Sequence, residues 1–324
     1  MSHSFHHSKL DQFKGIKKSM GDSDDKLSKE SQDKPNWTDS GVCVDSGLCI
    51  DIHSLPSTYD VDNPFKQDAD GDTMLHLAVI QGMTDFVKYL IKEAPSSEYL
   101  DIINDEYQTP LHLATITKQY GIISHLVASG ASLFIRDRNG NSPVHIACQN
   151  GDMMALKSIL SPRNTNDTNS SSSSSSSPFS QSSIESSLNS RNYEGETCLH
   201  LAVKTGDKSL IEYLVNWGAD INAQEGKSGK TVLHYAILAQ KLDLVQFLIY
   251  TCKCSPAVRT YGGLTPMHLL RGLLEVNPNS GKLRAIHQML TECGCECEPY
   301  STAQDYDSDF DYYSGQESDD DVLL

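Results

Sequence analysis

The hexapeptide TPLHLA at residues 109–114 is one of six related stretches in this chain. The six stretches are TMLHLA at 73–78, TPLHLA at 109–114, SPVHIA at 142–147, TCLHLA at 197–202, TVLHYA at 231–236 and TPMHLL at 265–270. Their first residues lie 36, 33, 55, 34 and 34 positions apart, so one interval is longer than the others by about two thirds of a repeat. A period near 33 residues with this core predicts a unit made of a turn and two antiparallel helices. Such a stack supplies a binding surface, and we expect no catalytic residues in it.

This period and core are the signature of ankyrin repeats. In the first repeat, residues 70–72 are expected to form a turn, Thr73 to cap the first helix and Gly82 to end it. In repeats two and five we expect the helix break at Gly121 and at Lys241, the latter in place of a glycine. The predicted fold is therefore an all-α ankyrin-repeat solenoid of six repeats, with a disordered N-terminal arm and an acidic C-terminal tail.

Composition divides the chain into five parts. They are a disordered signal-response arm at 1–66, ankyrin repeats 1–3 at 67–160, a Ser-rich flexible insertion at 161–190, ankyrin repeats 4–6 at 191–292 and an acidic tail at 293–324. The arm is rich in Ser, Asp and Lys and cannot bury enough apolar surface to order itself. The insertion holds eight consecutive serines at 170–177, and a loop of this kind interrupts a stack at little entropic cost. A regulatory role for that loop remains an alternative to a tolerated insertion.

One histidine recurs at the fourth position of every hexapeptide. The six are His76, His112, His145, His200, His234 and His268. Because they recur at a fixed spacing, they form a ladder along the repeats, and we interpret them as structural hydrogen-bonding groups rather than as metal ligands or acid–base catalysts. Cys293, Cys295 and Cys297 lack a CxxC pair and a partner histidine, so the prediction is no metal and no cofactor.

The formal charge of −17 is concentrated at the C-terminus, where residues 291–324 hold 11 Asp or Glu and no Lys or Arg. Direct binding to nucleic acid is unfavourable for such a chain, and a basic protein partner is expected instead. The N-terminus shows no secretory signal, no apolar run approaches about 18 residues, and nine scattered cysteines suit a reducing compartment. We therefore expect a cytoplasmic protein, with shuttling to the nucleus as an open alternative.

The arm contains the tripeptide Asp-Ser-Gly twice. The residues are Asp39, Ser40, Gly41, Asp45, Ser46 and Gly47, with Val42 and Leu48 after them. Phosphorylation of Ser40 and Ser46 would create compact acidic hooks that suit an Arg-lined pocket. Lys26, Lys29 and Lys34 are close enough to accept ubiquitin if such a hook recruits a ligase, although for any single lysine a merely solubilising role is favoured.

The tail mixes Pro, Glu, Ser, Thr and Asp, a composition typical of rapid-turnover PEST segments. Ser308, Ser314 and Ser318 each precede an acidic residue by three positions, the pattern that a casein kinase II-type kinase selects. The aromatic residues among these carboxylates favour docking on a basic, partly apolar surface over a purely solubilising role. They are Tyr306, Phe310, Tyr312 and Tyr313.

An arm with Asp-Ser-Gly, six ankyrin repeats and an acidic PEST-like tail, in that order, resembles the IκB family of Rel/NF-κB inhibitors, and its Cactus-like members above all. The segment QDADGDTMLHLA at 67–78 is similar to the opening of the family's first repeat. The resemblance implies cytoplasmic retention of a Rel/NF-κB dimer. The first repeats would mask its nuclear-localisation segment, and the later repeats and tail would cover its dimerisation and DNA-binding surfaces.

The resemblance also implies release by degradation. An IκB kinase-type kinase would phosphorylate the arm, a β-TrCP-type ubiquitin ligase would bind it, and the proteasome would destroy the protein. The chain departs from the family pattern here, because the family's second serine follows the first by four residues. Val44 and Ile50 occupy those positions after Ser40 and Ser46. Signal-induced degradation therefore requires a stretched or Asp-substituted hook.

Two other functions remain open. A nuclear IκB-like transcriptional cofactor would also bind Rel proteins, but such proteins tend to lack the Asp-Ser-Gly arm and the acidic tail. A generic ankyrin adaptor, such as a ligase substrate receptor, is the other candidate, although no SOCS-box-like or FBox-like helix pair follows the repeats.

Overall fold

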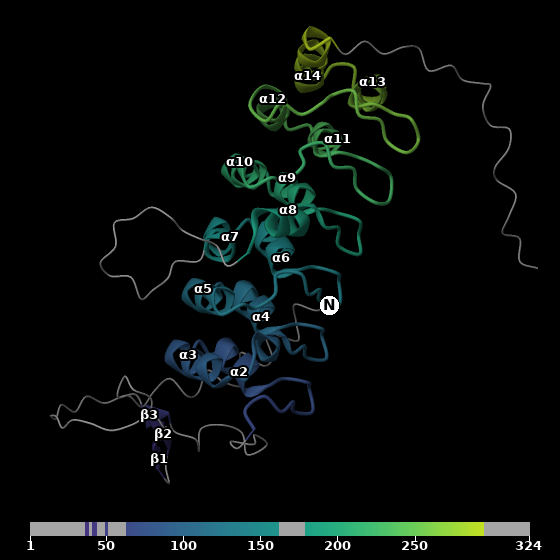
Figure 1. Ribbon diagram of the computed structural model, residues 1–324. Helices are drawn as coiled ribbons and strands as arrows, with labels where there is room; N and C mark the ends of the chain where they lie inside the picture. Colours follow the sequence, from purple (N-terminus) through teal and green to yellow (C-terminus); the bar gives the residue numbers. More distant parts are fainter. Residues whose placement is uncertain (1–35, 39–40, 44–48, 51–62, 162–178, 295–324) are drawn as a thin grey trace, which may run out of the picture.

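The computed structural model describes residues 36–38, 41–43, 49–50, 63–161 and 179–294. Its main body is a stack of six helix pairs, one pair for each hexapeptide (Figure 1). The first helices are α2 (Met74–Gln81), α4 (Pro110–Ile116), α6 (Pro143–Gln149), α9 (Cys198–Thr205), α11 (Val232–Leu238) and α13 (Pro266–Val276). The second helices are α3 (Thr84–Glu93), α5 (Tyr120–Ala128), α7 (Met153–Leu160), α10 (Lys208–Asn216), α12 (Leu242–Tyr250) and α14 (Gly281–Glu292). The predicted helical solenoid of six repeats is confirmed.

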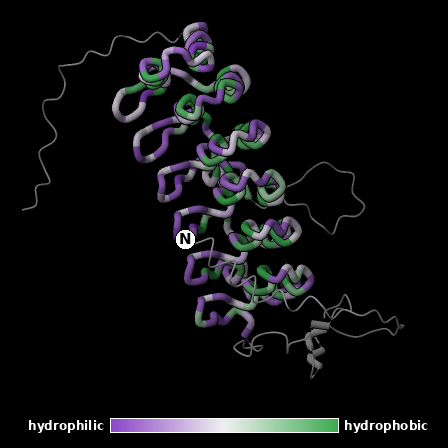
Figure 2. The backbone as a smooth tube through the Cα atoms, turned by 180° about the vertical axis from the view of Figure 1, so that it is seen from behind, coloured by the Kyte–Doolittle hydropathy of each residue, from purple (hydrophilic) through white to green (hydrophobic). Residues whose placement is uncertain are grey.

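The first helices form one column and the second helices form another beside it, while loops project from the far side of the first column (Figure 1). Each first helix packs on the first helix of the next repeat, from α2 on α4 to α11 on α13. Neighbouring second helices also pack, as α5 does on α7 and α12 does on α14. Hydrophobic residues gather in the helices and the loops are hydrophilic along the whole stack (Figure 2).

A single hydrophobic core runs through the repeats, from Phe65 in front of the first repeat to Leu290 in the last. The first helices are buried on nearly all sides, as α2 is from Met74 to Val79. The second helices are amphipathic and bury one stripe, such as Leu210, Ile211 and Leu214 of α10. Each fully buried Leu or Ile contributes roughly 1.5–3 kcal/mol to stability. No repeat could bury this surface alone, so the units are stable only as a stack.

The prediction of a flexible insertion at 161–190 is wrong for the last third of this range. Residues Gln181–Asn189 form helix α8, which packs on α6 and α9. Ile184 and Leu188 are 1% and 0% exposed, so this helix is part of the core although its sequence is rich in serine. An apolar pair at i and i+4 is enough to direct one helical face inward. The eight serines at 170–177 lie outside the described residues.

The disorder predicted for the arm at 1–66 needs a similar correction, because short strands occur within it. Strands β1 (Asn36–Thr38), β2 (Gly41–Cys43) and β3 (Cys49–Ile50) form an antiparallel sheet in the order β1-β2-β3. Trp37 lies opposite Val42, and Val42 lies opposite Ile50. Aromatic and β-branched residues favour strands, and here this local preference prevails over the polar composition of the arm.

In repeats one to five the break between the two helices lies nine residues after the Thr or Ser, whatever residue occupies that position. Gly82, Gly151 and Gly206 are there with positive φ values of 71°, 64° and 83°. In repeats two and five the same position holds Lys118 (φ 58°) and Gln240 (φ 51°). The predicted breaks at Gly121 and Lys241 are therefore wrong. Gly121 lies inside α5, and Lys241 is the residue that precedes α12.

The repeated histidines connect consecutive repeats. The Thr or Ser that begins each hexapeptide directly precedes the first helix of its repeat. The side-chain oxygen of this Thr or Ser lies 2.7–2.9 Å from Nδ1 of the histidine three residues later. The backbone N–H of the same Thr or Ser also points at Nδ1, so this nitrogen accepts. The arrangement is a capping box in which histidine takes the place of Glu or Gln.

The other ring nitrogen reaches the following repeat. Nε2 of His76 lies 3.0 Å from the carbonyl oxygen of Gln108, and Nε2 of His112 lies 3.1 Å from that of Asn141. The series continues with His145 and Ser190 (3.1 Å), His200 and Lys230 (3.1 Å), and His234 and Leu264 (3.3 Å). A carbonyl oxygen only accepts, so Nε2 carries the proton and the ring is neutral. The structural interpretation of these histidines agrees with this geometry.

Burial lowers the pKa of His76 and of His200, and it lowers the pKa of His112 and of His234 to about 4. An unfolded histidine has a pKa near 6.5. The folded state therefore excludes a proton that the unfolded state binds between these two values. The stabilisation is complete above about pH 6.5 and is lost as the pH falls toward about 4.

We predict that acidification from pH 7.5 to 5.0 lowers the free energy of unfolding, by up to about 1.4 kcal/mol per pH unit for each of these histidines. His112→Ala should cost about 3 kcal/mol at pH 7.5, since it leaves buried partners without a hydrogen bond. It should also show a smaller loss on acidification than the wild type, because one titrating group is gone.

Urea unfolding followed by circular dichroism at both pH values measures these quantities. His125→Ala is the matched control, because His125 lies on α5 in the same repeat, is only half-buried and belongs to no ladder. Equal losses for the two variants at pH 7.5 would contradict the assigned role of His112.

Candidate binding surface

The loop in front of each first helix forms a short projection, which we call a finger. Fingers 1 to 6 comprise residues 68–72, 104–108, 137–141, 192–196, 225–230 and 260–264, and a backbone hydrogen bond between the two end residues closes each one. In fingers 1 to 3 an Asp or Asn side chain at the first position accepts backbone N–H groups of its own finger. Oδ1 of Asp137, for example, accepts from Asn139 and Asn141, both at 2.8 Å.

A second ladder joins the fingers near their tips. The backbone N–H of Asp105 donates to the carbonyl oxygen of Asp70 at 3.1 Å, and that of Tyr193 donates to Asn139 at 3.2 Å. The remaining pairs are Arg138 to Glu106 (3.2 Å), Gly226 to Gly195 (2.8 Å) and Tyr261 to Ser228 (3.0 Å). Because backbone atoms hold the fingers in register, the side chains at the tips are free to vary and to contact a partner.

Exposed aromatic rings mark several tips. Tyr107, Tyr193 and Tyr261 are 54%, 66% and 58% exposed. The Tyr193 ring lies over Gly140, since a Cβ built on that glycine would come within 2.5 Å of the ring. Tyr261 lies over Gly229 in the same way. Exposed, rigid aromatic side chains next to charges are typical of protein-binding surfaces.

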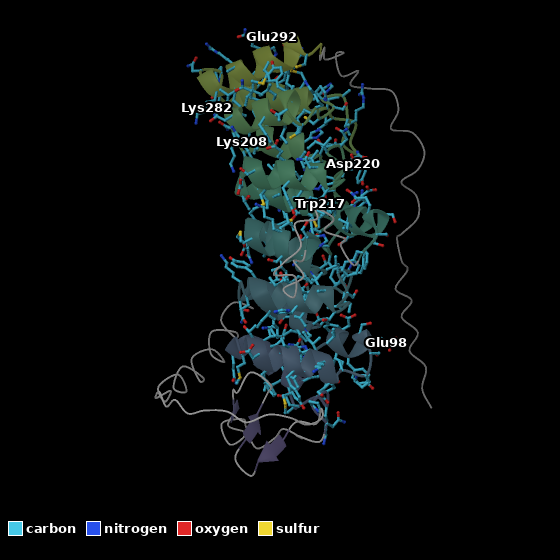
Figure 3. All side chains as sticks on the ribbon, turned by 60° about the vertical axis from the view of Figure 1, so that its left-hand side comes forward. Glu98, Lys208, Trp217, Asp220, Lys282 and Glu292 are labelled. Atoms are coloured by element: carbon cyan, nitrogen blue, oxygen red, sulfur yellow. The ribbon has the colours of Figure 1, made fainter. Side chains whose placement is uncertain are left out.

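A groove of about 920 Å³ opens beside fingers 3 to 5. Its charged lining residues are Arg136, Arg191, Lys227 and Asp220, and Tyr193 borders it as well. One wall is fixed by Nη2 of Arg191, which donates to the carbonyl oxygen of Gln224 at 2.6 Å. Lys227 pairs with Glu194 at the tips of neighbouring fingers. Asp220 is labelled on this side of the stack in Figure 3.

Charge changes sign along the stack. Residues 66–133, which hold fingers 1 and 2, contain four Lys and nine Asp or Glu. Residues 134–294 contain fifteen Lys or Arg and thirteen Asp or Glu. The net charge is therefore −5 in the first part and +2 in the second. The first two fingers suit a basic ligand, whereas the groove beside fingers 3 to 5 suits an acidic one.

Two cysteine thiols lie inside the stack. Cys148 and Cys198 are fully buried free thiols and contribute to packing. The described residues contain no group of three or more His, Cys, Asp or Glu side chains arranged to hold a metal ion. Every helix in the described part of the chain is too short or too polar to cross a lipid bilayer.

Most residues that the sequence predicted as regulatory sites lie outside the described residues. They are Lys26, Lys29, Lys34, Asp39, Ser40, Asp45, Ser46, Gly47, Ser308, Ser314 and Ser318. Gly41 is described and begins β2. Of the three tail cysteines, Cys293 is a free, exposed thiol at the end of α14, and the other two are outside the described part. These sites stay predictions.

The finger residues were not predicted from the sequence, although a signal for them is present. An Asp or Asn stands five positions before the Thr or Ser in repeats one to four, at Asp68, Asn104, Asp137 and Asn192. That position predicts a turn closed by its own side chain. Exposed tyrosines in such a turn then point to a contact surface.

Comparison with known proteins agrees with the stack. The family described as ankyrin repeats (3 copies) matches residues 44–137 and 119–260. The NF-kappa-B inhibitor cactus of Drosophila yakuba is 35% identical over 223 residues, which are 65% of this chain and 45% of that protein. The NF-kappa-B inhibitor alpha of Gallus gallus is 40% identical over 206 residues, 63% of this chain and 59% of its own length. This chain thus spans about half the length of these relatives.

A solved structure of similar architecture is the ankyrin repeat domain of Bcl-3, described as a unique member of the IkappaB protein family. It superposes with a TM-score of 0.55 at 31% identity and covers 70% of this chain and 88% of its own. The family match and this structure agree that the chain consists of ankyrin repeats over these residues.

Two glycine substitutions test the packing of the tips. We predict that Gly140→Ala is more destabilising than Gly263→Ala, although both glycines have positive φ values of 76° and 75°. Both changes cost about 1 kcal/mol for the left-handed backbone. Only the Cβ at residue 140 meets another group, the ring and backbone of Tyr193, whereas nothing lies within 4 Å at residue 263. Overpacking adds about 1–3 kcal/mol at residue 140.

Urea unfolding of the two variants measures the difference, and the fluorescence of the chain reports whether the finger has moved. Equal free energies of unfolding for the two variants would contradict the described contact between fingers 3 and 4.

Proposed function

Because this chain belongs to the ankyrin-repeat proteins and, within them, to the IκB family, we propose that it binds a Rel/NF-κB transcription factor dimer and inhibits it. The observation that carries the proposal is the family membership itself, with relatives named as NF-kappa-B inhibitors at 35% and 40% identity. On this proposal the chain is a regulatory binding protein and not an enzyme.

The charge distribution supports binding of different parts of the partner by different repeats. The excess of carboxylates in residues 66–133 suits a basic segment, such as the nuclear-localisation segment of a Rel protein. Asp70 and Asp105 are exposed on fingers 1 and 2, where such a segment would lie. Covering it would keep the dimer in the cytoplasm, and this chain would be cytoplasmic with it. Shuttling to the nucleus remains compatible with the proposal.

The acidic tail would act at the other end of the stack. Residues 291–324 hold 11 carboxylates, which can compete with DNA phosphates for a basic groove on the partner. Such competition weakens as salt rises. Phosphorylation of Ser308, Ser314 and Ser318 by a casein kinase II-type kinase would add further negative charge.

Release by degradation is the finer part of the proposal. An IκB kinase-type kinase would phosphorylate Ser40 and Ser46, and a β-TrCP-type ligase would recognise them together with the flanking Asp and Gly residues. Lys26, Lys29 and Lys34 are the candidate ubiquitin acceptors. What supports this step is the doubled Asp-Ser-Gly sequence and the family, while the spacing of the two serines departs from the family pattern.

A second function has a specific observation in its favour. The Bcl-3 ankyrin domain covers 70% of this chain, and the B-cell lymphoma 3 protein homolog of Mus musculus is 34% identical over 222 residues. A nuclear cofactor that binds Rel dimers without retaining them is therefore the alternative. Imaging of the tagged chain before and after stimulation separates the two, since only an inhibitor that retains its partner holds Rel in the cytoplasm. A generic ankyrin adaptor would not bind Rel proteins at all.

We predict that the purified chain captures a Rel homology domain dimer and that Asp70→Asn with Asp105→Asn weakens the complex. The dissociation constant should rise about threefold to tenfold near physiological salt. The effect is modest because exposed charges at an interface mainly speed association and contribute little binding free energy. Biolayer interferometry at two salt concentrations measures this change. Glu212→Gln with Asp243→Asn is the matched control, since both side chains are exposed on the second helices α10 and α12.

Failure to capture any Rel-type dimer at low salt would overturn the proposed function. Capture that is weakened equally by the control pair would leave the partner in place and overturn the assignment of the first two fingers.

The degradation step has a separate test. We predict that Ser40→Ala with Ser46→Ala lengthens the half-life of the chain after stimulation, because no phosphorylated hook can form, and leaves Rel capture unchanged. A cycloheximide chase in stimulated cells measures the half-life. A Ser19→Ala with Ser23→Ala variant, in the same arm but outside Asp-Ser-Gly, serves as the control. An unchanged half-life in the first variant would remove the degron and leave the binding proposal standing.

A further inference from the structure

The groove beside fingers 3 to 5 is the place where cations gather on an acidic chain. Arg136, Arg191 and Lys227 line it, and Asp220 is the single carboxylate among its lining residues. Arg136 is exposed and forms no salt bridge with any residue that the structure describes. A partner that is itself basic would be repelled here, so this surface is not explained by binding to a basic transcription factor.

Contacts within the chain satisfy the groove cations only in part. Nη2 of Arg191 donates to the carbonyl oxygen of Gln224, which holds the guanidinium at the wall but provides no countercharge. Lys227 shares the carboxylate of Glu194, and both side chains are largely exposed at 61% and 69%. An arginine fork in this setting is suited to a carboxylate, which it binds through two parallel hydrogen bonds.

The groove also offers apolar and aromatic surface. Tyr193 borders it with an exposed ring, held in place over Gly140, and Ala223 contributes a small apolar side chain. Aromatic rings stack on arginine and on one another. The ligand that fits is therefore an extended peptide that carries both carboxylates and aromatic side chains.

We propose that this groove binds an acidic, aromatic-containing peptide and that its occupant is the chain's own C-terminal segment, residues 295–324. This segment holds ten Asp or Glu and no Lys or Arg. Its aromatic residues are Tyr300, Tyr306, Phe310, Tyr312 and Tyr313. The negative charge of residues 66–133 repels the same segment, which restricts it to the C-terminal half of the stack.

The length of the segment permits this contact. It begins directly after Gly294, at the end of α14 in the sixth repeat. Adjacent helices pack about 8–10 Å apart, so fingers 5 to 3 lie about 10–30 Å back along the stack from the sixth repeat. A coil of thirty residues spans about 30 Å on average, and a fully extended one about 100 Å. Covalent attachment raises the effective concentration to the millimolar range, which favours this occupant over a free peptide.

The C-terminal segment would occupy the groove while no partner protein is bound. In that state its carboxylates are not available to another basic surface, and the tips of the fingers beside the groove are covered. A partner with a more basic surface would displace it, since the groove carries only three cations. The proposal goes beyond Rel binding and does not depend on it.

Zero-length cross-linking tests the contact in the full-length chain. A carbodiimide joins a lysine amine to a carboxylate in direct contact, and peptide mass spectrometry locates the link. We expect a link from Lys227 to a carboxylate of residues 295–324 at low salt, and we expect it to disappear near about 0.5 M NaCl, where exposed charges are screened. The link from Lys227 to Glu194 is the internal standard for a folded finger.

Lys208 is the control lysine for Lys227. It lies on α10, on the opposite side of the stack from the groove residue Asp220 (Figure 3). Arg136→Gln should lower the yield of the link to the C-terminal segment several-fold, and Arg136→Gln with Arg191→Gln should lower it about tenfold. Arg138→Gln should leave it unchanged, since Arg138 pairs with Glu106 and does not line the groove. The Lys227–Glu194 link must persist in each variant.

The outcomes separate clearly. A Lys227 link to Glu194 alone overturns the proposal, as does an equal yield at Lys208. A mixture of isotope-labelled and unlabelled chains reports whether the link lies within one chain, and links found only between chains would assign the groove to a second copy. Loss of Rel capture has no bearing on any of these results, so the two proposals fail independently.

Discussion

The hydrogen bonds of the histidine in each repeat are the interaction on which the rest of the structure depends. One ring nitrogen accepts from the Thr or Ser that begins the helix, and in repeats one to five the other donates to a backbone carbonyl of the next repeat. A single side chain thus fixes the start of its own helix and the distance to its neighbour. Because the site is buried, an unmade bond there would be costly, and the repeats are held in one register.

This ladder leaves the fingers free to carry function. Histidine hydrogen bonds fix the base of each finger next to the helices, and backbone hydrogen bonds fix the tips. Neither set depends on the exposed side chains. The tips can therefore differ from repeat to repeat without loss of the fold. The acidic residues 66–133 and the mildly basic residues 134–294 are an example, and they suit ligands of opposite charge.

The stack also tolerates interruption, for a physical reason. Consecutive repeats contact each other through helices and fingers, so an added loop need only return the chain to the next helix. The long interval between repeats three and four meets this condition, and it adds helix α8, whose Ile184 and Leu188 join the core. The serine-rich composition of this segment did not predict a buried helix. Composition gives the average polarity of a segment, whereas burial depends on the residues of one helical face.

The sequence by itself determined the number of repeats, the start of every first helix and the structural role of the histidines, because these features repeat with a period that only one architecture satisfies. It also located the charged C-terminal segment, since charge needs no fold to be counted. Only the tertiary structure decided where the helix breaks lie in repeats two and five, where Lys118 and Gln240 adopt a left-handed backbone that packing imposes. It alone brought Arg136, Arg191 and Lys227 to one groove, because residues 55 and 36 positions apart become neighbours only when the repeats stack.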